Sequence, residues 1–123
     1  MGIVIHGVII AANTVVFMGP SYSVGYGTSG STESQAVYRS TRTGKIRRAR
    51  VFVQSNTKNG VTLLSIRVAG VDVLSTSIPA GDTTPIDIPG EGSVADGQEV
   101  SVKADTSAST LGFIVPVISY EIA

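Results

Sequence analysis

Short runs of β-branched residues, separated by turn residues roughly every 8 to 12 positions, constrain the fold of this chain more than any other feature. No helical start signal followed by a stripe of period 3.6 is present, so the pattern predicts an all-β sandwich or barrel. The runs lie at residues 3–10, 14–18, 35–40, 45–54, 61–68, 71–78, 85–88, 94–103 and 111–122.

The length of 123 residues allows a single domain, because a second one would be too small to have its own core. The 42% hydrophobic and 15% charged content excludes a disordered chain. Within this domain we distinguish an N-terminal part, residues 1–34, from the sandwich core, residues 35–123. The Gly/Ser/Tyr-rich segment 19–34 is either a solvated loop or an arm that orders on a partner, with Tyr22 and Tyr26 as anchors.

The first 32 residues contain no Asp, Glu, Lys or Arg. Their apolar run is shorter than the roughly 20 residues that span a bilayer, and Gly7 and Asn13 interrupt it. The start also lacks the positive charge of a signal peptide. We therefore expect an N-terminal apolar strand in a protein made inside the cell, with no membrane partner.

Alternation along the runs predicts which side chains face the core. Thr62, Leu64, Ile66 and Val68 form one inward set. Ile46 is out of phase with the inward residues that follow it on the same run, which predicts a β-bulge near Arg47-Arg48.

The last run is apolar on both faces, which is typical of a strand that is covered on both sides. Ile118, Tyr120 and Ile122 share one face. The opposite face would be covered by a neighbouring subunit. We therefore expect a subunit interface formed by Ile3, Ile5, Leu111, Phe113, Val115 and Val117.

Eight of the nine basic residues precede residue 71, and eight of the nine acidic residues follow residue 70. The basic stretch at 39–50 can meet acidic loops of the same subunit, or acidic surface on a neighbour. Nucleic acid is disfavoured, because the pI is about 6.5 and no aromatic stacking platform interleaves the stretch. The candidate partner contacts are Arg39, Arg42, Lys45, Arg47, Arg48 and Arg50, together with Tyr22 and Tyr26.

Catalysis has little support in this sequence. There is no Cys, and His6 is the only histidine, in an apolar run that favours a packed side chain over a general base. We interpret the acidic residues as turn formers, because Asp accepts backbone hydrogen bonds in turns, and they show no metal-binding loop pattern. We expect no catalytic site, no metal and no cofactor, and therefore not an enzyme.

Five short sequence segments have the same layout as in one protein family: TGKI at 43–46, RVFVQSN at 50–56, VAGVD at 68–72, IPAG at 78–81 and VADGQEVSV at 94–102. In this layout the chain resembles jelly-roll proteins that decorate or cement the capsids of tailed bacteriophages. The resemblance implies a two-sheet antiparallel jelly roll of about eight strands. It also implies a homotrimer that binds and stabilises the major capsid protein shell on the virion exterior, made in the host cytoplasm.

Similar layouts occur in head and tail fibres, so the alternative is a jelly-roll binding module that recognises a receptor or a glycan. Sugar sites use exposed aromatic residues beside Asp, Asn or Arg, and the lack of Trp weighs against this alternative. A jelly-roll enzyme with a metal in its barrel would need more than one histidine.

Overall fold

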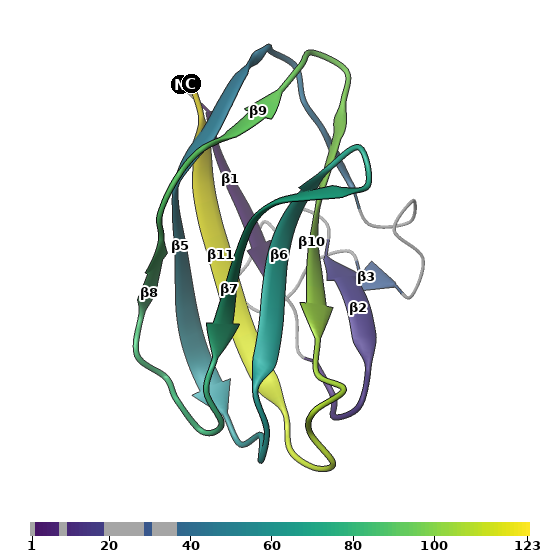
Figure 1. Ribbon diagram of the computed structural model, residues 1–123, viewed down its shortest axis with the longest axis vertical. Coiled ribbons are helices and arrows are strands. Elements are labelled where there is room, and N and C mark those ends of the chain that lie inside the picture. The colour runs from purple at the N-terminus through teal and green to yellow at the C-terminus, as the bar shows by residue number, and fades with distance from the viewer. Residues whose placement is uncertain (1, 8–9, 19–28, 31–36) are drawn as a thin grey trace.

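The computed structural model describes residues 2–7, 10–18, 29–30 and 37–123 (Figure 1). Every regular element in these residues is a β-strand, which confirms the predicted fold class. The strands are β1 (Gly2–Gly7), β2 (Val15–Met18), β3 (Ser29–Gly30), β4 (Tyr38–Arg39), β5 (Gly44–Asn56), β6 (Thr62–Val68), β7 (Val71–Ile78), β8 (Ile86–Ile88), β9 (Gly92–Val94), β10 (Glu99–Asp105) and β11 (Ile114–Ile122).

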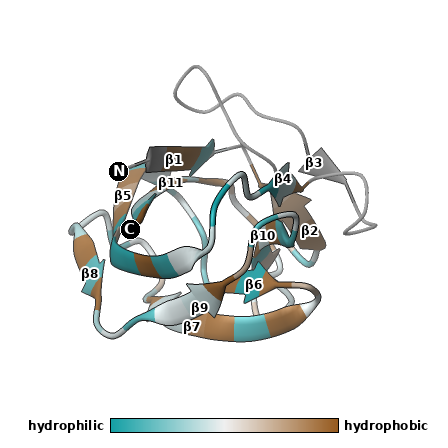
Figure 2. Cartoon of the chain, turned by 90° about the horizontal axis from the view of Figure 1, so that it is seen from above, coloured by the Kyte–Doolittle hydropathy of each residue, from teal (hydrophilic) through white to brown (hydrophobic). Residues whose placement is uncertain are grey.

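The strands form two antiparallel sheets that pack face to face (Figures 1 and 2). Sheet A has the order β1-β11-β5-β8, with β9 also paired to β5. Sheet B has the order β3-β2-β10-β6-β7, with β4 paired to β10. The predicted two-sheet antiparallel sandwich is therefore confirmed, although the described residues contain eleven strands because several are only two or three residues long.

The inward side chains of both sheets form one hydrophobic core. The predicted inward set on β6 is confirmed, because Thr62, Leu64, Ile66 and Val68 are all buried. Sheet A contributes residues such as Val51 and Ile118, neither of which is exposed at all. The core thus requires the period-two alternation that the sequence displays.

The predicted run 94–103 is wrong as a single strand, because a turn at Ala95–Gln98 divides it into β9 and β10. Gly97 has φ of +85°, and the Gln98 amide donates to the Ala95 carbonyl at 3.1 Å. This turn carries the chain from sheet A to sheet B. The predicted run 111–122 also begins too early, because β11 starts at Ile114 and Gly112 has φ of +92°.

The N-terminal strands belong to the sandwich. β1 is an edge strand of sheet A, where Gly2 lies opposite Ile122 at the end of β11, and β2 pairs with β10 in sheet B. The segment containing Tyr22 and Tyr26 lies outside the described residues.

His6 connects the two sheets. It is fully buried on β1, its Nδ1 lies 2.8 Å from the Met18 carbonyl oxygen on β2, and its Nε2 lies 2.7 Å from the Tyr120 hydroxyl. Because a carbonyl only accepts, Nδ1 donates the proton there. Burial raises the pKa of Tyr120, so its hydroxyl stays protonated and hydrogen-bonds to Nε2. The predicted packed histidine is confirmed.

Candidate binding surfaces

The predicted β-bulge near Arg47-Arg48 is confirmed. Arg50 lies opposite Ser119 and Arg47 lies opposite Glu121, so β5 contains one more residue than β11 between these two pairs. Arg48 has φ of +54°, a left-handed conformation that non-glycine residues adopt infrequently. The extra residue directs the side chains of both Arg47 and Arg48 toward Glu121. The Nε atoms of Arg47 and Arg48 lie 2.9 Å and 3.4 Å from Glu121 Oε1.

The structure pairs most of the basic stretch with acidic residues of the same chain, the first of the alternatives that the sequence left open. Only Arg42 among the six basic candidate contacts lacks an ion pair within the described residues, and its guanidinium donates to the Ile122 carbonyl. The five ion pairs are Arg39–Glu99, Lys45–Glu91, Arg47–Glu121, Arg48–Glu121 and Arg50–Asp87. Contact of these residues with a partner stays a prediction, and such a contact would use the donors that remain exposed.

Phe52 lies on the outer face of sheet A, next to one of these ion pairs. Its side chain points away from the core and is 42% exposed. The Arg50 guanidinium lies over the Phe52 ring, 5.0 Å from its centroid, and Arg50 Nε lies 3.3 Å from an Asp87 carboxylate oxygen on β8. Ser119 of β11 lies opposite Arg50 in the ladder. An aromatic ring, a guanidinium, a carboxylate and a hydroxyl therefore gather on one sheet face.

The six predicted interface residues do not behave alike. Ile5, Leu111 and Phe113 are exposed and Val115 is half-buried, as an interface would require. Val117 is already covered within the single chain, and the side chain of Ile3 is outside what the structure describes. The role of this set in a subunit contact stays a prediction.

The loop before β11 holds Phe113 in a fixed position. The Thr57 amide donates to the Phe113 carbonyl at 2.8 Å, and the Phe113 amide donates to the Thr57 hydroxyl at 2.9 Å. Gly112 approaches the Thr57 carbonyl so closely that a Cβ there would clash with it. Asn59 adds a third anchor, because its side-chain oxygen accepts from the Thr110 amide. Phe113 is thus an exposed aromatic side chain on a rigid backbone.

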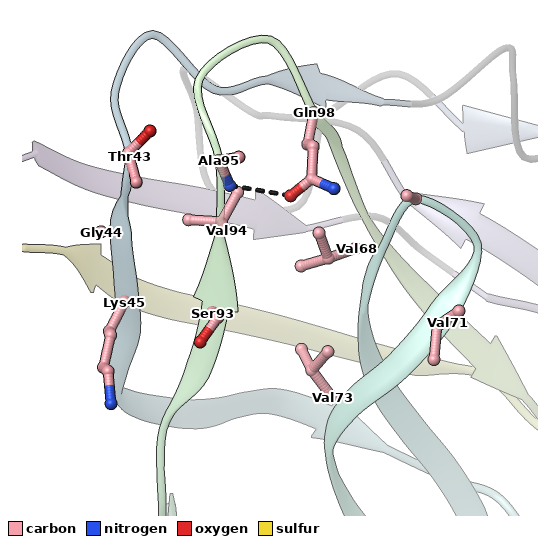
Figure 3. Close-up of a pocket in the computed structure, with 11 residues that line it drawn as sticks. Thr43, Gly44, Lys45, Val68, Val71, Val73, Ser93, Val94, Ala95 and Gln98 are labelled. Carbon is pink, nitrogen blue, oxygen red and sulfur yellow. Dashed lines mark hydrogen bonds between the residues drawn. The ribbon is translucent and has the colours of Figure 1, made fainter.

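A pocket of about 680 Å³ lies between the two sheets at the opposite end of the sandwich (Figure 3). Val68, Val73 and Val94 line its walls, and the Gln98 side-chain oxygen accepts from the Ala95 amide at its rim. Beside the pocket the sheets close tightly, because a Cβ on Gly92 would lie 2.7 Å from a Val73 methyl group. The described residues that line this pocket include no aromatic side chain, so it offers aliphatic walls with a polar rim.

Two kinds of feature are absent from the residues that the structure describes, 2–7, 10–18, 29–30 and 37–123. No group of three or more His, Cys, Asp or Glu side chains gathers there in a way that could hold a metal ion. Nor does this part of the chain contain a helix with the length and apolarity needed to cross a membrane.

Sequence reasoning did not single out Asp87, Ser119 or Glu121 as site residues. The signal was available, because Asp87 lies between two isoleucines of a short run and Glu121 lies between Tyr120 and Ile122. Alternation places both carboxylates on the outer face when their neighbours point inward. What the sequence lacks is the pairing of β5 with β8 and β11, which brings these side chains to the arginines.

Comparison with known proteins supports the fold. No family model and no curated protein matches the chain. A family 35 carbohydrate-binding module from Clostridium thermocellum matches over 100% of both chains, with 18% sequence identity and a TM-score of 0.53. A GH26-CBM35 β-(1,4)-mannanase from Podospora anserina matches over 96% of this chain with 15% identity and a TM-score of 0.49, and the chain spans 28% of that enzyme. The first likeness establishes a jelly-roll β-sandwich.

Proposed function

We propose that this chain is a non-catalytic module that binds a glycan on the outer face of sheet A. The observation that carries the proposal is the exposed Phe52 ring beside the Arg50–Asp87 pair. The C–H face of a sugar packs on an aromatic ring, while its hydroxyls need both donors and acceptors fixed nearby. Arg50 supplies the donors, Asp87 the acceptors, and Ser119 both.

Two further points support this proposal over the other surfaces. The valine-walled pocket offers no aromatic ring among its described residues, so it suits a sugar less well than the sheet face. A structure of the same fold is a carbohydrate-binding module, which is compatible with glycan binding here. Because one fold supports many functions, the argument depends on the side chains and the likeness only agrees with it.

A glycan array followed by calorimetric titration of the binding sugar tests the proposal. Phe52→Ala should weaken affinity by roughly 10- to 30-fold, the usual effect of truncating an aromatic anchor. The matched control is Leu63→Ala, which removes an exposed apolar side chain from the outer face of sheet B and should leave affinity unchanged. The proposal is wrong if the array gives no saturable hit, or if both variants lose affinity equally.

A second candidate function is a structural subunit that decorates the head of a tailed bacteriophage, and the exposed Ile5, Leu111 and Phe113 favour it. Ile5 lies on the edge strand β1 and the other two lie in the loop before β11, and exposed apolar side chains such as these are typical of surfaces that other subunits cover. The resemblance in the sequence adds a homotrimer and a capsid shell as partners. Light scattering should then give a trimer, and the protein should co-sediment with purified capsids; a stable monomer at micromolar concentration would contradict the trimer.

A further inference from the structure

We infer that a phosphate or sulfate ester group of the ligand binds beside Arg48, at the β-bulge of sheet A. The inference rests on the proposed glycan site and specifies the chemistry of its ligand. Four observations support it: the backbone conformation of Arg48, the charge balance around Glu121, the free hydrogen-bond donors, and a small pocket between them.

The backbone at Arg48 adopts a conformation that glycine would favour. Its φ of +54° places a long side chain in the left-handed region, where the Cβ comes too close to the following carbonyl oxygen. Bulges next to binding sites commonly redirect a side chain in this way. Here the bulge presents the Arg48 guanidinium on the same face as Arg50 and Phe52.

The charges at the bulge do not balance. Arg47 and Arg48 both contact the same oxygen of Glu121, whose side chain is only 7% exposed. Two guanidinium groups therefore share one carboxylate, and these three groups together carry one positive charge. Arg47 makes the shorter contact and donates a hydrogen bond, so Arg48 is the group whose charge is left uncompensated.

Donors are also available at this position. Apart from the 3.4 Å ion pair of Arg48, neither its guanidinium nor the Ser119 hydroxyl hydrogen-bonds to another residue in the described part of the chain. Arg48 and Ser119 line a pocket of about 130 Å³, together with Tyr120 and Glu121. This pocket has room for several water-sized groups, and therefore for a phosphate or sulfate group.

A tetrahedral oxyanion fits these features better than a carboxylate. The planar Arg48 fork can bind two oxygens of a phosphate or sulfate, while the Ser119 hydroxyl donates to a third. A carboxylate has only two oxygens and would leave one of these donors unused. Ser119 lies opposite Arg50, so the ester group would sit beside the sugar that packs on Phe52.

The test compares one sugar in four forms: unsubstituted, sulfated, phosphorylated and carrying a carboxylate. Each is titrated into the full chain at constant ionic strength, and inorganic phosphate is titrated separately while NMR follows the Arg48 side-chain signals. We expect the sulfated and phosphorylated forms to bind about tenfold more tightly than the unsubstituted sugar, the usual gain from charge-assisted hydrogen bonds. Inorganic phosphate should shift the Arg48 signals saturably.

Arg48→Gly is the decisive variant, because glycine relieves the positive φ and so the protein should fold at least as well. This variant should lose the tenfold gain and keep the affinity for the unsubstituted sugar. Lys103→Gln is the matched control, since it removes the same charge from the outer face of sheet B, and it should keep the gain.

The outcomes separate this inference from the proposed function. Equal binding of the ester and the unsubstituted sugar overturns the inference and leaves the glycan site standing. An equal gain for the carboxylate form overturns the assignment to a tetrahedral oxyanion. If no form binds, the glycan proposal fails; the phosphate titration still decides the anion site, because unshifted Arg48 signals would refute it.

Discussion

The outer faces of the two sheets each carry an arginine that lies over a phenylalanine ring and pairs with an aspartate, but the two arginines differ in exposure. On sheet A, Arg50 lies over Phe52 and pairs with Asp87 at 3.3 Å. On sheet B, Arg67 lies over the Phe17 ring, 5.8 Å from its centroid, and pairs with Asp72 at 2.6 Å. The Arg67 side chain is 17% exposed, whereas that of Arg50 is 49% exposed.

The difference comes from where each arginine finds its partners. Asp72 is five residues from Arg67, across the β6–β7 hairpin, and Arg67 also donates to the Gly70 carbonyl in the turn. Asp87 comes from a separate strand, and it leaves the Arg50 guanidinium open to solvent. An arginine, an aspartate and a phenylalanine therefore do not make a binding site by themselves; the pair on sheet B stabilises a hairpin, and the pair on sheet A is available to a ligand.

Truncating each arginine should separate these roles, and it gives the largest expected effect. Arg67→Ala removes a mostly buried guanidinium, its ion pair with Asp72 and its hydrogen bond to the turn, so the free energy of unfolding should fall by about 1–2 kcal/mol. Arg50→Ala removes a solvent-exposed pair and should lower it by less than about 0.5 kcal/mol. Urea denaturation of both variants measures the difference, and equal losses would contradict the distinction.

The aspartates provide the corresponding comparison for ligand binding. Asp87→Asn weakens the acceptors on sheet A, so affinity for the glycan should fall roughly fivefold, about 1 kcal/mol. Asp72→Asn makes the same change on sheet B and should leave affinity unchanged. Calorimetric titration of both variants measures the effect. A loss of similar size in the Asp72 variant would mean that the ligand does not discriminate between the two faces.

Sequence patterns predicted the parts of this arrangement that depend on local phase. Ile46 and Val51 are out of phase although both face inward, and a strand of period two needs one extra residue to allow this. That phase shift predicted the bulge at Arg47-Arg48. Asp96-Gly97 is a turn signal in the sequence, but the apolar residues on both sides of it favoured the prediction of one continuous strand. Local phase shows which residues face outward, but it does not show when the chain changes sheets.

The candidate site was less predictable, because it depends on pairing between distant strands. The basic stretch was recognised, but Asp87 meets Arg50 only because β8 pairs with β5. The burial of one lysine was also not predicted. Lys58 is 3% exposed, although it lies in a polar stretch between two strands that reads as a solvated turn.

Lys58 lies in the loop that joins β5 to β6, between the strands that carry Arg50 and Arg67. Its ammonium is buried without a hydrogen-bond partner among the described residues, and burial lowers the pKa of Lys58 below its usual 10.5. Below that lowered pKa the folded protein bears the full desolvation penalty. Between it and 10.5 the folded state releases a proton that the unfolded state keeps, so the free energy of unfolding rises with pH.

Lys58→Met should therefore stabilise the protein by about 1 kcal/mol at neutral pH, and the gain should shrink as pH approaches 10.5. Thermal denaturation of both proteins at several pH values measures it. Lys103→Met is the control, since Lys103 is only partly buried and its variant should show no such convergence. A gain that stays constant up to pH 10.5 would contradict the role of the buried charge.

The smallest expected effect concerns Asp105, on the outer face of sheet B. The hydroxyl and the amide of Ser107 donate to its carboxylate, and these hydrogen bonds hold the pKa of Asp105 below its usual 3.8. A carboxyl whose pKa is lowered by folding contributes stability above the unfolded value, and this contribution is lost as pH falls through the folded value.

Asp105→Asn keeps an acceptor oxygen and removes the charge, so it should lower the free energy of unfolding by less than about 1 kcal/mol at pH 7. As pH falls from 3.8 through the lower folded pKa of Asp105, the stabilities of the two proteins, measured by denaturation, should converge, because the wild-type carboxyl then becomes protonated in the folded state as well. If the difference between them persists at the acid end, the stabilisation does not depend on ionisation, and the hydrogen-bonded turn alone accounts for it.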